Sequence, residues 1–172
     1  MNDTGELFER FSKVASKNKY SWFPIHRSAE EIALTQPENR MIGLPYTKYM
    51  NSIMRVNQSC ALILMSAKKA RELGIPTSKW VFMYAGACIN DIWNVSDRVD
   101  YSSSPAIKAC SDNVFELADV KIEELNFIDL YSCFPSAVQI AMKELELSKD
   151  DPRGLTVTGG LPYFGGPGNA YV

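Results

Sequence analysis

Short apolar runs and amphipathic stretches alternate along the last two thirds of this chain. Runs of mainly apolar or β-branched residues, typical of strands covered on both faces, occupy 61–65, 80–85, 127–131 and 155–158. Between them, hydrophobic residues recur with helical spacing, which predicts helices over 67–73, from Ser104 onward, and over 135–145. The resulting order, β-α-β-α-β-α-β, favours an α/β fold with a mixed, mostly parallel sheet and helices on both faces.

Capping residues support these helix boundaries. Ser66 precedes the first of these helices as a candidate N-cap, and Gly74 followed by Pro76 ends it. Ser104 followed by Pro105 combines a serine N-cap with proline at the first helical position. The predicted helix ends therefore rest on local backbone chemistry as well as on hydrophobic spacing.

The first part of the chain is less regular. Residues 3–17 predict an amphipathic helix. Residues 28–34 predict a short helix in which Ser28 is the N-cap and Glu31 occupies the third helical position. Residues 36–47 are loop-like because prolines and a glycine interrupt them.

Length and composition bound the organisation of the chain. With 172 residues, 46% of them hydrophobic and 22% charged, it can form one globular domain with an appendage. We therefore expect two parts. Residues 1–45 form an irregular appendage outside the main core, and residues 46–172 form the main α/β domain.

Charge and composition exclude several function classes. A net charge of −2 offers no basic surface for nucleic acid. Neither a secretory signal nor an apolar run near the ~20 residues of a membrane span is visible, so we expect a cytoplasmic protein without membrane contact. The cysteines are dispersed and the only histidine is His26, so no metal site is expected. We interpret the four cysteines as buried free thiols: Cys60, Cys88, Cys110 and Cys133.

Glycines gather near the end of the sequence. The run at 155–158 leads into Gly159-Gly160 and then into Gly165-Gly166-Pro167-Gly168. So many glycines indicate positive φ angles or a backbone that approaches another group closely, and such a loop at the end of a strand favours a ligand site. It is not a phosphate loop, because Gly166 stands where that motif requires lysine. A plain series of β-turns is the alternative.

A second candidate lies where 127–131 passes into the next helix. A helix N-terminus lowers the pKa of a thiol, so Cys133 could be activated at this junction. The alternative is that Ser132 caps the helix beside a buried Cys133. A nucleophile also needs a base, and the only histidine, His26, lies in the appendage. Asp129 could orient a hydrogen-bond donor near the junction.

A third candidate is the segment 46–60, which mixes methionines, tyrosines and amides. Met50, Ile53 and Val56 have helical spacing, and packing in the core is one interpretation of them. The other is an adaptable, methionine-rich wall of a ligand tunnel.

These three segments, in this order, resemble the thiolase superfamily, especially the thiolase-like acetyl-CoA acetyltransferases. Such proteins carry an Asn-Asp-Gly-Ala-Ala-type segment, a Leu-Met-Ser strand and a Lys-Ala-x-Glu-Leu-Gly helix, which correspond here to residues 57–66 and 69–74. They carry Asn-Glu-Ala-Phe, or His-Asp-Cys-Phe in the sterol-carrier type, where this chain has Tyr131-Ser-Cys-Phe134. Their Gly-Gly-x-x-x-x-Gly-His-Pro motif corresponds to Gly159-Gly-Leu-Pro-Tyr-Phe-Gly-Gly-Pro167.

The resemblance implies a C-terminal-half fragment of a thiolase-like protein. Residues 1–45 would be a remnant of the loop domain, and residues 46–172 a C-terminal-type domain truncated at its C-terminus. The nucleophilic cysteine would lie in a missing N-terminal half, and the second cysteine of the family beyond Val172. The implied activity is acyl transfer on acyl-CoA thioesters, of the acetyl-CoA C-acyltransferase type, in lipid metabolism. Coenzyme A would be part of the substrate, no separate cofactor is implied, and a homo-oligomer such as a dimer is expected.

The same resemblance assigns residues to the substrate cavity. Its substrate-binding set would be Met54, Phe134, Gly165, Gly166 and Pro167, with Met54 near the serine that contacts coenzyme A.

The departures from the family motifs concern catalysis. Gly166 stands where the catalytic histidine would be, and Tyr131 stands where an asparagine or histidine would hold the oxyanion-hole water. Tyr131 and Cys133 remain candidates for an altered catalytic site. We expect this chain alone to be inactive. The alternative function is a non-catalytic thiolase-like subunit that binds acyl-CoA or a partner protein.

Overall fold

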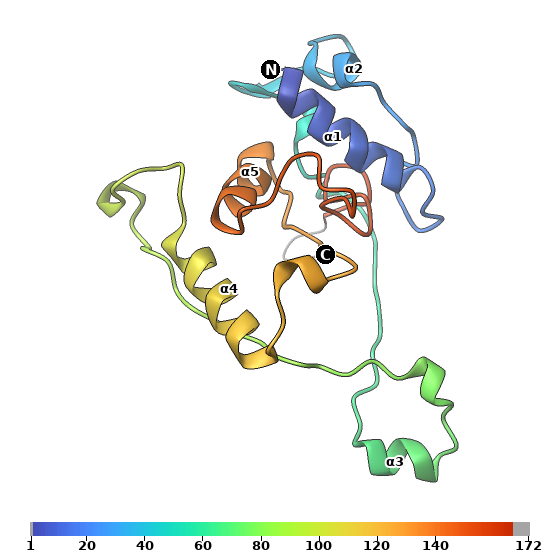
Figure 1. The fold of residues 1–172 in the computed structure, drawn as a ribbon. Coiled ribbons are helices and arrows are strands. Elements are labelled where there is room, and N and C mark those ends of the chain that lie inside the picture. Colours follow the sequence, from blue (N-terminus) through green and yellow to red (C-terminus); the bar gives the residue numbers. More distant parts are fainter. Residues whose placement is uncertain (1, 167–172) are drawn as a thin grey trace.

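The computed structural model describes residues 2–166, in which helices and irregular segments dominate (Figure 1). The α-helices of this range are α1 (Asn2–Ala15), α2 (Ala29–Ala33), α3 (Ala67–Glu72), α4 (Pro105–Ala118) and α5 (Pro135–Glu144). Two short strands, β1 (Met41–Gly43) and β2 (Tyr46–Thr47), pair antiparallel. Short 3-10 turns lie at Lys48–Met50, Thr77–Lys79, Val95–Asp97 and Ile122–Glu124.

The helices begin and end where the capping residues predict. The Ser28 side chain accepts a hydrogen bond from the Glu31 amide while the Glu31 carboxylate accepts one from the Ser28 amide, so α2 has a complete capping box. Ser66 and Ser104 cap α3 and α4 through their side chains, and Pro105 is the first residue of α4. These sequence predictions are confirmed.

One hydrophobic core joins the two ends of the described chain. Phe8 and Phe11 of α1 stack with ring centroids 5.3 Å apart, and the Tyr163 ring meets Phe8 edge-on. Val138 of α5 is fully buried in the same core. The expectation that residues 1–45 lie outside the main core is therefore wrong, because the apolar face of α1 is covered by the C-terminal segments. The boundary between residues 45 and 46 stays a prediction.

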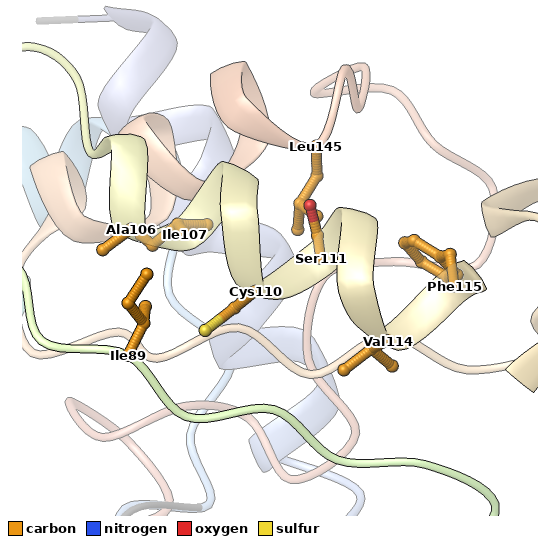
Figure 2. A pocket seen from close by; sticks show the side chains of 8 residues that line it. All are labelled: Ile89, Ala106, Ile107, Cys110, Ser111, Val114, Phe115 and Leu145. Carbon is orange, nitrogen blue, oxygen red and sulfur yellow. The ribbon is translucent and has the colours of Figure 1, made fainter. Parts of the chain in front are cut away.

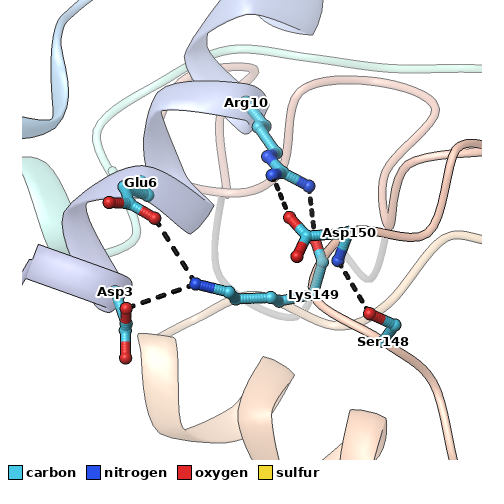
Figure 3. A network of polar contacts seen from close by, with 6 residues as sticks. All are labelled: Asp3, Glu6, Arg10, Ser148, Lys149 and Asp150. Carbon is cyan, nitrogen blue, oxygen red and sulfur yellow. Dashed lines mark hydrogen bonds and ion pairs between the residues drawn. The ribbon is translucent and has the colours of Figure 1, made fainter.

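Polar contacts at the surface reinforce this closure (Figure 3). The Lys149 ammonium lies 3.3 Å from the Asp3 carboxylate and 3.5 Å from that of Glu6, both on α1. Arg10, one turn further along α1, forms an ion pair with Asp150. The 148–150 loop is thereby attached along one side of α1, although such exposed pairs contribute little stability individually.

Residues 36–47, expected as a loop, contain the one sheet found among residues 2–166. A buried amide explains why this segment is ordered. The Asn39 Nδ2 donates to the carbonyl oxygens of Glu31, Ile32 and Leu34 at 2.9–3.0 Å, and its Oδ1 accepts from the Tyr49 amide at 2.8 Å. One side chain thus joins the end of α2 to the 3-10 turn that follows β2.

The predicted parallel sheet is not formed within the described residues. Segments 61–65, 80–85, 127–131 and 155–158 contain no assigned strand. Between 127–131 and 155–158 the backbone hydrogen bond is a single one, from the Leu130 amide to the Leu155 carbonyl at 3.0 Å. A strand needs a neighbour that pairs along its length, and apolar composition alone cannot supply one. The burial expected of Leu155 is confirmed.

The cysteines also differ from expectation. All four are free thiols, as predicted, but Cys60 and Cys88 are exposed, and Cys110 and Cys133 are half-buried. The two exposed thiols flank the segment that carries α3, which lies far from α1 and α5 (Figure 1).

Candidate functional site

The three segments singled out by the sequence meet in the structure. The Ser52 amide donates to the Cys133 carbonyl at 3.1 Å, and the Ile53 amide donates to the Leu161 carbonyl at 3.2 Å. The Gly166 amide closes the set by donating to the Ile53 carbonyl at 2.9 Å. The segment 51–58 therefore lies between the 131–134 junction and the 159–166 glycine loop and is bonded to both.

Ser132 attaches the glycine loop to the junction. Its side chain is 1% exposed, and its Oγ accepts a hydrogen bond from the Leu161 amide at 3.0 Å. Ser132 does not cap α5, as one interpretation of the sequence had it, because the N-cap of α5 is Phe134 and has no side-chain cap. A serine placed before the helix instead satisfies a loop amide 29 positions away.

Close approach explains the glycine at position 160. Its φ is 75°, and a Cβ there would lie 2.6 Å from Cδ2 of Phe11 and 2.7 Å from Oγ of Ser132. No side chain fits such a distance without displacing a neighbour. The prediction of close backbone approach is confirmed at Gly160. The loop also turns, because the Tyr163 and Phe164 amides both donate to the Gly160 carbonyl.

Gln58 fixes the far end of the glycine loop. Its Nε2 donates to the Phe164 carbonyl at 2.9 Å, and its amide group occupies the space where a Cβ of Gly165 would stand. The sequence marks the amides of segment 46–60 but points to no role for Gln58 or Ser52. One signal for Gln58 exists in the sequence: it is a polar residue shortly before an apolar run, at a position where it caps no helix.

Gly166, which the sequence resemblance aligns with the catalytic histidine of thiolases, lies against Ser52. A Cβ at residue 166 would come within 2.2 Å of the Ser52 Oγ and within 3.1 Å of the Leu161 side chain. A histidine at this position would require the Ser52 hydroxyl to turn away and Leu161 to shift. The backbone at residue 166 is therefore closely packed by its neighbours.

Among the predicted site residues, Met54, Tyr131 and Phe134 are accessible, whereas Gly165 and Gly166 are buried. Met54 is 71% exposed, and Tyr131 and Phe134 are both 45% exposed. The Phe134 ring also stacks on Tyr46 of β2, with centroids 6.1 Å apart. Cys133, which lies between Tyr131 and Phe134 in the sequence, is half-buried. Pro167 lies outside the described residues.

The segment 46–60 is core at one end and accessible at the other. Met50 is 1% exposed and belongs to the central core, and Val56 is also buried. Met54, between them, points out of that core. The core-packing interpretation therefore holds for Met50 and Val56, and the ligand-tunnel wall stays a prediction. Only the beginning of the segment is helical, as a single 3-10 turn.

Asp129 holds the two C-terminal segments in register near the junction. Its carboxylate accepts a hydrogen bond from the Val157 amide at 2.9 Å. Partial burial raises the pKa of Asp129, against the hydrogen bonds from the Val157 and Thr158 amides, which lower it. Its donor partners are backbone amides, so it positions the chain rather than a reacting group.

Residues 2–166 contain neither a metal-binding cluster nor a membrane-spanning helix. No cluster of histidine, cysteine, aspartate or glutamate side chains in this range could hold a metal ion. His26, the only histidine, lies 3.5 Å from the Glu9 carboxylate on α1. No helix in this range is long and apolar enough to cross a membrane.

Comparison with known proteins identifies relatives of which this chain matches a part. No protein-family model matches it. The chain is 24% identical over 143 residues to an acetyl-CoA acetyltransferase from Methanocaldococcus jannaschii, covering 83% of this chain and 35% of that protein. Its structure matches the crystal structure of a monomeric SCP2-thiolase-like protein type 1 from Mycobacterium smegmatis with a TM-score of 0.88 and 42% identity. That match covers 96% of this chain and 36% of the other. The chain thus spans about a third of the length of both relatives.

Proposed function

Because this chain is thiolase-like in both sequence and fold, we propose that it forms part of an acyltransferase that acts on acyl-CoA thioesters. One relative is named an acetyl-CoA acetyltransferase, and the other an SCP2-thiolase-like protein. The proposed reaction class is that of an acetyl-CoA C-acyltransferase, with coenzyme A as the carrier portion of the substrate. Lipid metabolism is its proposed setting.

The observation that carries the proposal is the meeting of the three segments. The hydrogen bonds from Ser52 to Cys133 and from Gly166 to Ile53 join the segments that resemble three thiolase motifs. Segments far apart in sequence are thereby held together, and Met54, Tyr131 and Phe134 on them are accessible. Accessible apolar side chains on a backbone fixed by hydrogen bonds suit an acyl chain or a pantetheine arm.

In this proposal the chain binds and orients the thioester. Ser132, through the Leu161 amide, and Gln58, through the Phe164 carbonyl, fix the loop that lines the site. Phe134 and Met54 contact the acyl-CoA by apolar packing. The acylated thiolate and its base are proposed to come from the part of a longer thiolase-like protein that this chain does not span.

A second candidate function is a non-catalytic thiolase-like subunit that binds acyl-CoA or a partner protein. The packing at residue 166 favours it, because the place of the family's histidine is taken by a glycine against which Ser52 and Leu161 pack. A site closed in this way binds substrate without a general base at that position.

Calorimetric titration of this chain with acetyl-CoA tests the binding role. Phe134→Ala removes an accessible ring from the proposed surface and should weaken binding roughly tenfold, which corresponds to about 1.4 kcal/mol. Val99→Ala shortens an equally apolar side chain that is fully exposed elsewhere and should leave the affinity unchanged. Absence of heat with acetyl-CoA, or an equal effect of both substitutions, would count against an acyl-CoA site here.

Mass spectrometry after incubation with acetyl-CoA separates the two candidates. Acetylation of Cys133 would assign chemistry to this chain itself and keep the altered catalytic site. Binding without any acetylated cysteine fits either the non-catalytic subunit or an enzyme whose thiolate lies in another part. The same incubation with the chain joined to that other part then decides between these two.

A further inference from the structure

Ser52 carries a hydroxyl that the fold itself does not use. The residue is half-buried, and its Oγ forms no hydrogen bond to another group within residues 2–166. Other hydroxyls around the same core are bonded to the chain. Thr47 donates to the Ile32 carbonyl at 2.6 Å, and Ser21 donates to the Tyr163 carbonyl at 2.8 Å. The Ser52 hydroxyl is therefore a donor that is available to a ligand.

The backbone around Ser52 fixes where this hydroxyl lies. The Ser52 amide donates to the Cys133 carbonyl at 3.1 Å. Ile53, the next residue, donates to the Leu161 carbonyl at 3.2 Å and accepts from the Gly166 amide at 2.9 Å. Because two consecutive residues are held by three hydrogen bonds, the hydroxyl moves mainly by rotation of its own side chain. A donor held in this way loses little freedom when a ligand binds.

The hydroxyl also stands in the space that a side chain at residue 166 would need. A Cβ there would come within 2.2 Å of the Ser52 Oγ. The resemblance to thiolases aligns Gly166 with their catalytic histidine, so in the proposed function this space belongs to the reacting end of the thioester and not to its coenzyme A arm. A glycine at 166 and a serine at 52 together put a hydroxyl there in place of an imidazole.

The chemistry of this hydroxyl is limited to hydrogen bonding. A serine becomes a nucleophile only when a base takes its proton. The Ser52 Oγ is bonded to no base within residues 2–166, and His26 lies beside Glu9 on α1. The accessible side chains nearby in sequence, Met54 and Phe134, are apolar. A polar donor beside apolar side chains fixes the orientation of a ligand by binding its polar atom.

We propose that the Ser52 hydroxyl donates a hydrogen bond to the acyl carbonyl oxygen of the bound thioester. This assignment rests on the proposed acyl-CoA function of the same site and names the group that recognises the acyl end. It serves either candidate function. A binding subunit needs a donor that distinguishes acyl-CoA from coenzyme A, and an acyltransferase needs a donor for the negative charge that develops on this oxygen when a thiolate adds to the carbonyl carbon.

Calorimetry with two ligands tests the proposal. Acetyl-CoA carries the carbonyl oxygen, whereas S-ethyl-CoA is a thioether of nearly the same size that lacks it. The parent chain should bind acetyl-CoA roughly tenfold more tightly than S-ethyl-CoA, which is the effect of about one hydrogen bond. Ser52→Ala should weaken acetyl-CoA binding by the same factor and leave the affinity for S-ethyl-CoA unchanged, so that the preference disappears.

Ser111→Ala is the matched control. Ser111 is likewise half-buried, but its hydroxyl donates to the Lys108 carbonyl at 2.8 Å within α4. Figure 2 shows Ser111 in a shallow groove of about 430 Å³ whose other lining residues include Ile107, Cys110 and Leu145. None of these residues belongs to the candidate site. The variant should keep both affinities, and it also reports whether acetyl-CoA binds in this groove instead.

Gly166→Ala moves the hydroxyl without removing it. The new methyl group stands where the Ser52 Oγ lies, so the hydroxyl must rotate away. The variant should lose the preference for acetyl-CoA as Ser52→Ala does, and the double variant should lose no more than either single one. The methyl group also approaches the Leu161 side chain. Circular dichroism therefore accompanies each titration, and Ser52→Ala, which removes no bonded group, decides the result if Gly166→Ala does not fold.

The outcomes separate this proposal from the proposed function. Equal affinities of the parent for both ligands, an undiminished preference in Ser52→Ala, or an equal loss in Ser111→Ala would each overturn the role of Ser52 and leave acyl-CoA binding in place. Additive losses in the double variant would contradict the position of the hydroxyl against residue 166. Absence of heat with either ligand in the parent would remove the proposed function, and the role of Ser52 with it.

Discussion

Replacing Gly160 with alanine tests how tightly the glycine loop is packed against α1 and the 131–134 junction. Two effects add at this position. A left-handed φ of 75° costs a non-glycine residue about 1–2 kcal/mol. A Cβ within 2.6 Å of the Phe11 ring and 2.7 Å of the Ser132 Oγ adds about 1–3 kcal/mol of overpacking. We expect Gly160→Ala to lower the free energy of unfolding by about 2–5 kcal/mol.

Gly154→Ala is the matched control, because it has the same backbone conformation without the contacts. The φ of Gly154 is 72°, and no atom lies within 4 Å of the position of its Cβ. This variant should lose only the conformational part, about 1–2 kcal/mol. The difference between the two variants thus isolates the contact of the loop with Phe11 and Ser132.

Urea unfolding at 25 °C, followed by circular dichroism of the helices, measures both variants against the parent. The midpoint should fall further for Gly160→Ala than for Gly154→Ala, with an unchanged denaturant dependence. Equal midpoints for the two variants would refute the reasoning, because they would mean that the loop does not press on α1 in solution.

Three further predictions follow from buried or paired polar groups. Tyr163→Phe should raise the free energy of unfolding by about 1–3 kcal/mol in the same assay, because the buried Tyr163 hydroxyl has no hydrogen-bond partner within residues 2–166. The same burial raises the pKa of this phenol. A lower free energy of unfolding would mean that the hydroxyl is hydrogen-bonded. Asn39→Ala should cost about 3 kcal/mol or more, whereas Asn113→Ala, on the exposed side of α4, should cost less than about 1 kcal/mol; equal effects would contradict the role of Asn39. The hydrogen bond from Arg153 lowers the pKa of Asp151 to about 2, so the stability it contributes is present above pH ~4 and is lost as pH falls towards 2. The melting temperatures of the parent and Asp151→Asn should therefore differ at pH 6 and converge near pH 2, and a constant difference would refute this.

Local chemistry made the helices predictable. A serine N-cap accepts a hydrogen bond from an amide three positions along the chain. Ser28 and Ser104 therefore predict the starts of α2 and α4 from a few neighbouring residues. Hydrophobic spacing likewise identified the face of α1 that carries Leu7 and Phe11. Such signals need no knowledge of the remaining chain.

The strands could not be predicted in the same way, because a strand exists only beside another. The run 61–65 has the composition of a central strand and remains unpaired in this chain. Family motifs located the candidate site, but the groups that assemble it are joined over long distances. Ser132 binds Leu161 across 29 positions, and Gln58 binds Phe164 across 106. No local pattern in the sequence encodes such a pairing.

The closure of α1 onto the C-terminal segments has a consequence for biosynthesis. Asp3 and its partner Lys149 are 146 positions apart, and the ring that covers Phe8 belongs to Tyr163. At a translation rate of about 5–20 residues per second, α1 leaves the ribosome on the order of 10 s before its packing partners are made. During that interval the apolar side of α1 lacks its C-terminal partners, although α2, whose Ile32 belongs to the same core, is already made. A chaperone that binds short amphipathic helices would bind α1 during this interval. Slowly translated codons before residue 149 would lengthen the interval.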